Sequence, residues 1–226
     1  MLQLDKTKLA CCSSKSVLIK IVNRVFYPAL FLLVLVVLQD NMALFVFDRA
    51  AVGQGEWWRL LSAHFTHSSA SHALWDVLAF TGVTVCLSQY GVKQMVVSVV
   101  VGIAAVDGLL LSDLSSLDYY CGLSGIIFSP LFLLCYHFLQ ANRGIVGFLP
   151  MAIIFTKLIW EIHVQNTLLV DTPWPAYPEA HLAGLMGGLL CMAYIYLLRP
   201  TKTCHSAKVG MHGCHGPTIE HKPVGL

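Results

Sequence analysis

The chain has 226 residues, of which 57% are hydrophobic and 12% are charged, and its formal net charge is +2. Soluble domains carry about 25% charged residues, so this composition excludes a soluble globular domain and indicates an integral membrane protein with short loops. At about 20 residues per crossing, the length leaves room for about six helices. The basic residues are dispersed along the chain rather than gathered in a patch, so we expect no nucleic-acid partner.

Apolar runs follow a short polar start. The predicted spans cover residues 18–38, 70–89, 94–112, 121–139, 145–163 and 179–198. The runs lack the alternation of barrel strands and exceed their length, so we predict an all-α bundle of six transmembrane helices. The domain organisation is then an N-terminal segment at 1–17, a six-span domain at 18–199 and a polar tail at 200–226, for which we predict disorder.

Basic residues divide unequally between the two sides of this bundle. With the N-terminus inside, the outer segments hold only Arg49 and Arg59. The inner segments hold Lys6, Lys8, Lys15, Lys20, Arg24, Lys93, Arg143, Arg199, Lys202, Lys208 and Lys222. This positive-inside asymmetry predicts a multi-pass protein of the cell inner (plasma) membrane with both termini cytoplasmic.

The first outer loop, at about 39–69, is unusually long and not very polar. Its segments 42–47 and 57–61 are apolar, and the second contains two tryptophans. Tryptophan is favoured at the membrane–water interface, so these segments predict short elements lying in that interface.

Two polar side chains next to glycines stand out in the later spans. Ser124 lies in Gly122-Leu123-Ser124-Gly125, and His181 precedes a Gly184-xxx-Gly188 pair. A polar group inside a membrane span is costly and is a functional-site hypothesis by default. The small-xxx-small spacing permits close helix contact in lipid, which would bring Ser124 within reach of His181.

A serine hydroxyl is a weak nucleophile until an adjacent base accepts its proton. The tetrahedral intermediate then needs hydrogen-bond donors at its oxyanion. If a helix begins near Leu123 and Ser124, its first backbone N–H groups are unpaired and could serve. His72 and Asp76, at i and i+4 on the second span, share a face and could supply side-chain groups.

These residues resemble the motifs of the rhomboid intramembrane serine proteases, over about residues 57–198. The resemblance is carried by four segments in this order: Glu56-Trp57-Trp58-Arg59-Leu60-Leu61, the stretch from His67 to Asp76 with its two histidines, Gly122-Leu123-Ser124-Gly125, and Ala180-His181-Leu182-Ala183-Gly184. It implies that Ser124 is the nucleophile and His181 the general base, in a dyad with no carboxylate and no cofactor.

The resemblance also implies roles for neighbouring residues. His72 and the backbone N–H of Ser124, in the segment that includes Gly122 and Leu123, would bind the oxyanion. Phe128 occupies a position where the family often has an aromatic residue stacked on the base. Trp57 and Arg59 would hold the first loop in the interface.

Asp76 departs from the family, which usually has asparagine at this position. A carboxylate cannot donate a hydrogen bond unless it is protonated. Either burial keeps Asp76 neutral so that it donates, or Asp76 pairs with His72 and keeps that imidazole protonated. We prefer the second account, and both predict that Asp76→Asn preserves or raises activity.

The compact form and the Tyr120-Cys121 pair before Gly122 resemble the rhombosortase branch of the family. That resemblance implies cleavage of C-terminal sorting anchors that contain a Gly-Gly motif, an apolar span and a basic end. The expected partners are single-pass membrane proteins or such anchor segments, within the lipid bilayer. The alternative is a catalytically inactive relative that binds membrane helices and acts as a chaperone.

The remaining polar residues predict structural roles. We expect His64 and His67 to join the first loop to the top of the second span, with no metal. Lys157 and Glu161, at i and i+4, are expected to pair with each other. The tail contains Cys204, His205, His212, Cys214, His215 and His221, which could bind zinc or copper, but their intervals match no structural zinc template.

Overall fold

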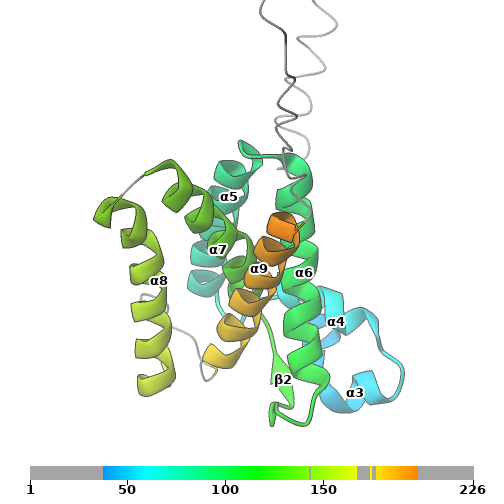
Figure 1. The fold of residues 1–226 in the computed structure, drawn as a ribbon. Helices are drawn as coiled ribbons and strands as arrows, with labels where there is room; N and C mark the ends of the chain where they lie inside the picture. Colours follow the sequence, from blue (N-terminus) through cyan, green and yellow to red (C-terminus); the bar gives the residue numbers. More distant parts are fainter. Residues whose placement is uncertain (1–37, 143, 167–173, 175–176, 198–226) are drawn as a thin grey trace, which may run out of the picture.

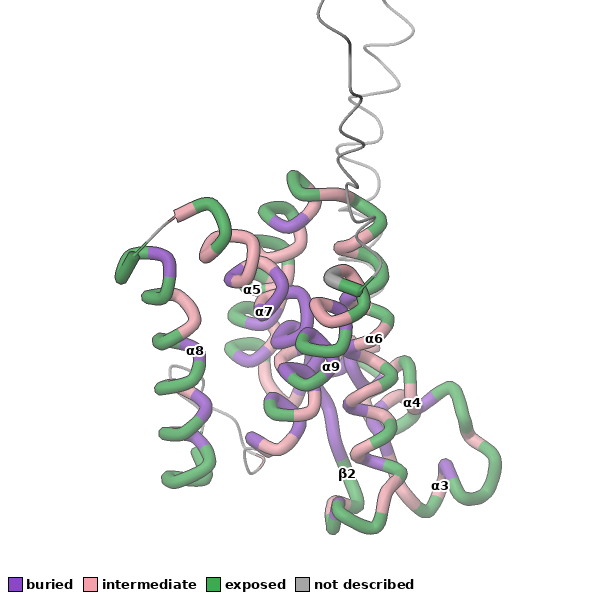
Figure 2. The backbone as a smooth tube through the Cα atoms, in the orientation of Figure 1, coloured by how far each residue is buried: buried purple, intermediate pink, exposed green. Residues whose placement is uncertain are grey.

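The computed structural model describes residues 38–142, 144–166, 174 and 177–197. Long helices make up the bundle: α5 (Ala70–Ser88), α6 (Val92–Leu111), α7 (Ser124–Ala141), α8 (Ile145–Val164) and α9 (Pro178–Leu197). Helix α7 lies at the centre and contacts each of the other four, while α8 stands at the edge of the bundle (Figure 1). Buried positions gather along α7 (Figure 2). Of the 18-residue apolar stretch in each helix, 50% is buried in α7 but only 11% in α5.

The helices α5, α6, α7 and α8 are long and apolar enough to cross a membrane. The protein is therefore a multi-pass membrane protein. Helix α9 has 20 residues but is not among these four candidates. The predicted first span at 18–38 falls outside the described residues except at its last position. The predicted segments 1–17 and 200–226, with the Cys and His residues of the tail, lie wholly outside them. The count of six spans therefore stays a prediction.

Glycines set the distance between α7 and α9. A methyl group on Gly184 would overlap the carbonyl oxygen of Gly125, and one on Gly188 would lie 2.6 Å from the carbonyl oxygen of Ser129. The two backbones are thus in direct contact, which confirms the close packing predicted from the glycine spacing. The start of α7 and the start of α9 consequently meet at the same end of the bundle.

The loop at 39–69, for which an outer location is predicted, folds into short elements at this end. They are α2 (Met42–Phe45), β1 (Phe47–Asp48), α3 (Arg49–Gly53), α4 (Trp58–Ser62) and the 3₁₀ turn η1 (Ala63–Phe65). Helices α2 and α4 confirm the short elements predicted there. The all-α prediction is wrong in one detail, because β1 pairs antiparallel with β2 (Tyr119–Tyr120), Phe47 facing Tyr120. Strands of two residues are too short to show alternation in a sequence.

Two arginines hold the loop in place. Arg59 is buried, and its Nη1 donates to the carbonyl oxygens of Ala43 and Val46, each at 2.9 Å. Arg49 donates to the carbonyl oxygens of Leu117 and Ser115, just before β2. These bonds join α4 to α2 and the loop to the segment that leads into α7.

Two tryptophans lie at the start of α4, Trp57 just before it and Trp58 as its first residue. Both are exposed, at 61% and 54%, and the indole of Trp58 donates to the carbonyl oxygen of Leu44 at 3.2 Å. The polar link from this pair to α2 therefore comes from Trp58, and Trp57 presents its ring to the surroundings.

Candidate active site

The structure brings Ser124 and His181 into contact. Ser124 is the first residue of α7, and His181 lies in the first turn of α9. Ser124 Oγ lies 3.0 Å from His181 Nε2, within hydrogen-bond distance. The imidazole is 3% exposed, while Ser124 is half-buried and remains accessible. The hydroxyl and the ring are therefore arranged for proton transfer in a site shielded from bulk solvent.

The face of the His181 ring packs against Phe128. The two rings are stacked, with centroids 4.6 Å apart and an angle of 15° between their planes. On Phe128, Lys157 Nζ lies 5.2 Å from the ring centroid, a cation–π distance. Phe128 thus occupies the place that the family resemblance implies, and its contact restricts rotation of the imidazole.

A carboxylate for which the sequence predicts only a pair with Lys157 completes the surroundings of His181. Glu161, near the end of α8, is fully buried, and its Oε2 lies 2.9 Å from His181 Nδ1. The expected pair with Lys157 is present, at 2.5 Å from Glu161 Oε1. The arrangement therefore differs from a dyad with no carboxylate. An intramembrane carboxylate is itself a signal of a functional site, and that signal could have marked Glu161.

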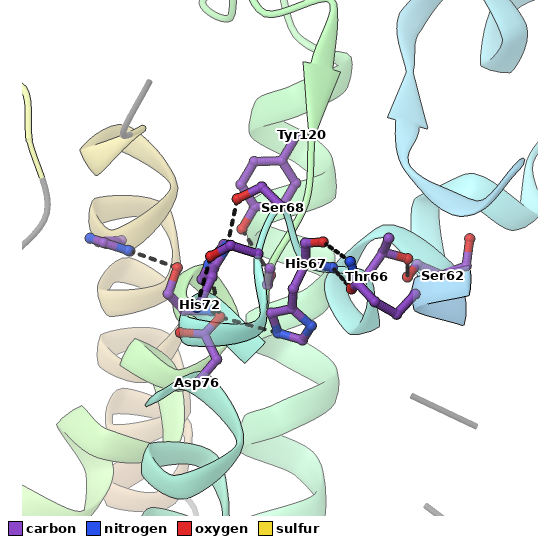
Figure 3. A network of polar contacts seen from close by, with 12 residues as sticks. Ser62, Thr66, His67, Ser68, His72, Asp76 and Tyr120 are labelled. Atoms are coloured by element: carbon purple, nitrogen blue, oxygen red, sulfur yellow. Dashed lines mark hydrogen bonds and ion pairs between the residues drawn. The ribbon is translucent and has the colours of Figure 1, made fainter. Parts of the chain in front are cut away.

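On the other side of Ser124, Asp76 receives several polar contacts at one oxygen (Figure 3). The backbone N–H of Ser124 donates to Asp76 Oδ2 at 3.0 Å. His72 Nε2 lies 3.2 Å from the same oxygen. His67 Nε2 lies 3.4 Å away, an ion-pair distance that lacks the alignment of a hydrogen bond. A carboxylate oxygen with three nitrogen atoms within 3.4 Å is suited to accept hydrogen bonds rather than to donate one.

This contact changes one expectation. The backbone N–H of Ser124 was expected to be unpaired at the start of a helix, but Asp76 occupies it. Nearby, Ser68 Oγ lies 3.2 Å from His72 Nδ1, so the imidazole is held on both of its nitrogens (Figure 3). In this structure the donor expected to bind the oxyanion is therefore already in use.

The turn before α7 requires glycine at position 122. Gly122 has φ +120°, a conformation that side chains rarely adopt, and a methyl group there would lie 2.8 Å from the His72 ring. Its N–H donates to the carbonyl oxygen of Ala63 at 3.0 Å, and Leu123, which follows, is fully buried. Gly122 thus permits the His72 imidazole to approach the backbone next to Ser124.

Tyr120, which by sequence is only a mark of a family branch, braces the same turn. Its phenol donates to the carbonyl oxygen of Gly122 at 3.3 Å and accepts from the backbone N–H of Gly125. Burial, and to a lesser extent the Asp76 carboxylate, raises the pKa of the Tyr120 phenol above its ordinary value. The phenol therefore stays neutral and keeps the proton that it donates.

The two histidines of the first loop contact different helices. His67 contacts Asp76 on α5, as expected, but His64 Nε2 lies 3.1 Å from Asp107 Oδ1 on α6. The expectation for His64 is therefore wrong in its partner, because η1 turns this side chain towards α6. Within the described ranges, no group of three His, Cys, Asp or Glu side chains is placed to hold a metal ion.

Residues 54–199 match the family model of the rhomboid domain. No curated protein matches the chain. The matched range begins in the outer loop before α4, includes every residue of the site around Ser124, and ends after α9. Because this match covers well over half of the chain, the protein belongs to the rhomboid family, whose members are generally intramembrane serine proteases.

Proposed function

We propose that this protein is an active serine endopeptidase that cleaves membrane-embedded segments through Ser124 and His181. The observation that carries the proposal is the 3.0 Å contact between Ser124 Oγ and His181 Nε2. A hydroxyl and an imidazole at this distance form the pair that nucleophilic catalysis of acyl transfer needs. The rhomboid domain itself implies an intramembrane protease-type function.

In the proposed reaction, Ser124 Oγ attacks the scissile carbonyl carbon while its proton passes to His181 Nε2. The carbonyl oxygen takes the electron pair and becomes the oxyanion. When the intermediate collapses, the C–N bond breaks and the proton on Nε2 passes to the leaving amine. Water then attacks the acyl-enzyme, His181 accepts its proton, and Ser124 regains that proton as the ester bond breaks.

The proposed donors to the oxyanion are a backbone N–H and an imidazole next to Ser124. The backbone N–H of Ser124 and the imidazole of His72 both face Asp76 Oδ2, at 3.0 and 3.2 Å. In the proposed mechanism a substrate carbonyl oxygen displaces the Asp76 carboxylate from the Ser124 N–H. His72 then donates to the oxyanion as the second hydrogen-bond donor.

The proposed substrates are single-pass membrane proteins or C-terminal anchor segments, cut near the outer face of the plasma membrane. The site supports this location because Ser124 and His181 both lie in the first turns of their helices, at the end of the bundle that carries the outer loop. The positive-inside asymmetry supports cytoplasmic termini. The Tyr120-Cys121 pair supports a rhombosortase-like preference for Gly-Gly sorting anchors.

Labelling of the full chain with a fluorescent fluorophosphonate tests the proposal. Wild type should be labelled, and Ser124→Ala and His181→Ala should each abolish labelling. Ser129→Ala is a matched control on the same helix, because the Ser129 hydroxyl donates to the carbonyl oxygen of Ser98 at 2.7 Å and contacts neither Ser124 nor His181. This control should be labelled like wild type.

One observation favours the alternative, a helix-binding relative without activity. The carboxylate of Asp76 blocks the Ser124 N–H in this structure. A folded wild type that takes up no label would support that alternative and contradict the protease.

If wild type is labelled, comparative proteomics of membrane and secreted fractions, with Ser124→Ala as the reference, should identify the substrates. The absence of Gly-Gly anchors among them would contradict the rhombosortase-like preference.

A further inference from the structure

The His181 imidazole is held between two partners, one on each ring nitrogen. Nε2 lies 3.0 Å from Ser124 Oγ, and Nδ1 lies 2.9 Å from Glu161 Oε2. The three side chains come from α7, α9 and α8, so no two of them are neighbours in sequence. The order hydroxyl, imidazole, carboxylate is that of a serine protease triad, which is recognised by geometry and not by sequence position.

The carboxylate decides which ring nitrogen carries the hydrogen. An ionised carboxylate only accepts hydrogen bonds, so the contact with Glu161 places the hydrogen on His181 Nδ1. Nε2 then presents its lone pair to Ser124 Oγ–H. This is the tautomer that a general base at Nε2 must have.

The carboxylate also acts after proton transfer. When His181 takes the proton of Ser124, a cation forms on a ring that is 3% exposed. Water cannot solvate that cation well, whereas Glu161, fully buried and 2.9 Å away, faces it with a negative charge. The interaction is stronger in the charged state than in the resting state, and such interactions accelerate a reaction.

The second oxygen of Glu161 explains how a carboxylate persists at this place. Lys157 Nζ contacts Oε1, so a permanent cation compensates the buried charge while Oε2 remains directed at His181. The competing interpretation is structural, since a Lys–Glu pair one turn apart on α8 that also reaches α9 could simply fasten the two helices. The two interpretations differ in what removal of each partner does.

We propose that Glu161 is a positioning residue that completes a Ser124–His181–Glu161 triad, holding the Nδ1–H tautomer and stabilising the imidazolium. Glu161 itself stays ionised throughout and exchanges no proton with His181. The inference rests on the proposed function, because a triad without an active serine has no role. It departs from the dyad with no carboxylate that the family resemblance implies.

The test measures fluorophosphonate labelling of the full chain as a function of probe concentration, for wild type and Glu161→Gln. The amide keeps the shape of the side chain but loses its charge. The maximal labelling rate constant should fall by between about 10²-fold and about 10⁴-fold, the upper value being the loss known for an amide at the third triad position. The half-saturating probe concentration should stay within about twofold, since Glu161 does not touch the probe.

Three further variants separate the triad from a structural clamp. Glu161→Asp keeps the charge and should label faster than Glu161→Gln. Lys157→Met removes the other half of the pair and should also label faster than Glu161→Gln. Asp107→Asn is the matched control, because Asp107 is a carboxylate 3.1 Å from the buried imidazole of His64. It should label like wild type.

Two outcomes overturn the inference while leaving the proposed function intact. One is a Glu161→Gln variant that labels within about twofold of wild type, a change too small for an interaction with the imidazolium. The other is a folded Glu161→Asp variant that labels as slowly as Glu161→Gln, because the charge would then not matter. A wild type that takes up no label overturns the proposed function, and the inference with it.

If Glu161→Gln does not fold, the tautomer of His181 decides. Nitrogen-15 NMR of histidine-labelled protein distinguishes hydrogen on Nδ1 from hydrogen on Nε2. The resonance is assigned by its disappearance in His181→Gln. Neutral His181 protonated on Nδ1 supports the triad, and neutral His181 protonated on Nε2 overturns it.

Discussion

Two buried carboxylates lie on opposite sides of Ser124, and they are arranged differently. Glu161 divides its oxygens, giving Oε1 to Lys157 and Oε2 to His181. Asp76 gathers its contacts on Oδ2, which faces His72, His67 and the backbone N–H of Ser124. One carboxylate thus contacts His181, the proposed base, while the other occupies the backbone N–H of Ser124, the proposed oxyanion donor.

The comparison teaches that the groups in contact with a carboxylate determine what its charge does in the proposed reaction. Glu161 faces the imidazole that accepts the proton in the proposed reaction, with Lys157 on its other oxygen. Asp76 instead faces the backbone N–H proposed to bind the oxyanion, where a negative charge opposes the charge that develops. Replacement by an amide should therefore be costly at Glu161 and tolerated at Asp76.

Outside the two carboxylates and the Ser124–His181 pair, the largest effect should come from Gly184→Ala. The added methyl overlaps the carbonyl oxygen of Gly125, so α9 must move away from α7 and carry His181 with it. A displacement of about 1 Å costs about 10²-fold in rate, and labelling by the fluorophosphonate should slow by that amount. Gly108→Ala is the control, because open space surrounds that glycine. Unchanged labelling of Gly184→Ala would show that the position of His181 between Ser124 and Glu161 does not depend on this helix contact.

A smaller effect should come from Tyr120→Phe, on the Asp76 side. Loss of the hydroxyl leaves the Gly122 carbonyl and the Gly125 N–H without this partner. The free energy of unfolding should fall by about 1–3 kcal/mol, the cost of leaving such groups unsatisfied. Thermal unfolding checks this, with the exposed Tyr194→Phe as the matched control. Equal midpoints for the two variants would mean that Tyr120 does not brace the turn.

The smallest effect should come from Asp76→Asn, which we expect to label as fast as wild type or faster. The amide can donate to an oxyanion and no longer places a negative charge beside it. Fluorophosphonate labelling compares this variant directly with Glu161→Gln, since each exchanges a carboxylate for its amide. An inactive Asp76→Asn would contradict both accounts of Asp76 and would remove the contrast between the two sides.

Much of the site follows from local sequence patterns. The Gly184-xxx-Gly188 spacing predicts the approach of α9 to α7, because a stripe without side chains leaves the backbone as the contact surface. The spacing of His72 and Asp76 places both on one face of a helix. Neither pattern reports on the strand pair β1–β2 or on the path of η1, which turns His64 towards Asp107 instead of α5.

The amino-acid sequence by itself determined that the protein lies in a membrane, that its spans are helices, and which serine and histidine are candidates for catalysis. These conclusions depend on composition and on spacing within one helix, which the sequence contains directly. Only the tertiary structure decided that Glu161 faces His181 and that Asp76 covers the Ser124 N–H. The i, i+4 rule finds Lys157 for Glu161 but cannot find a partner on another helix, because the rotation of α8 against α9 depends on how all the helices pack.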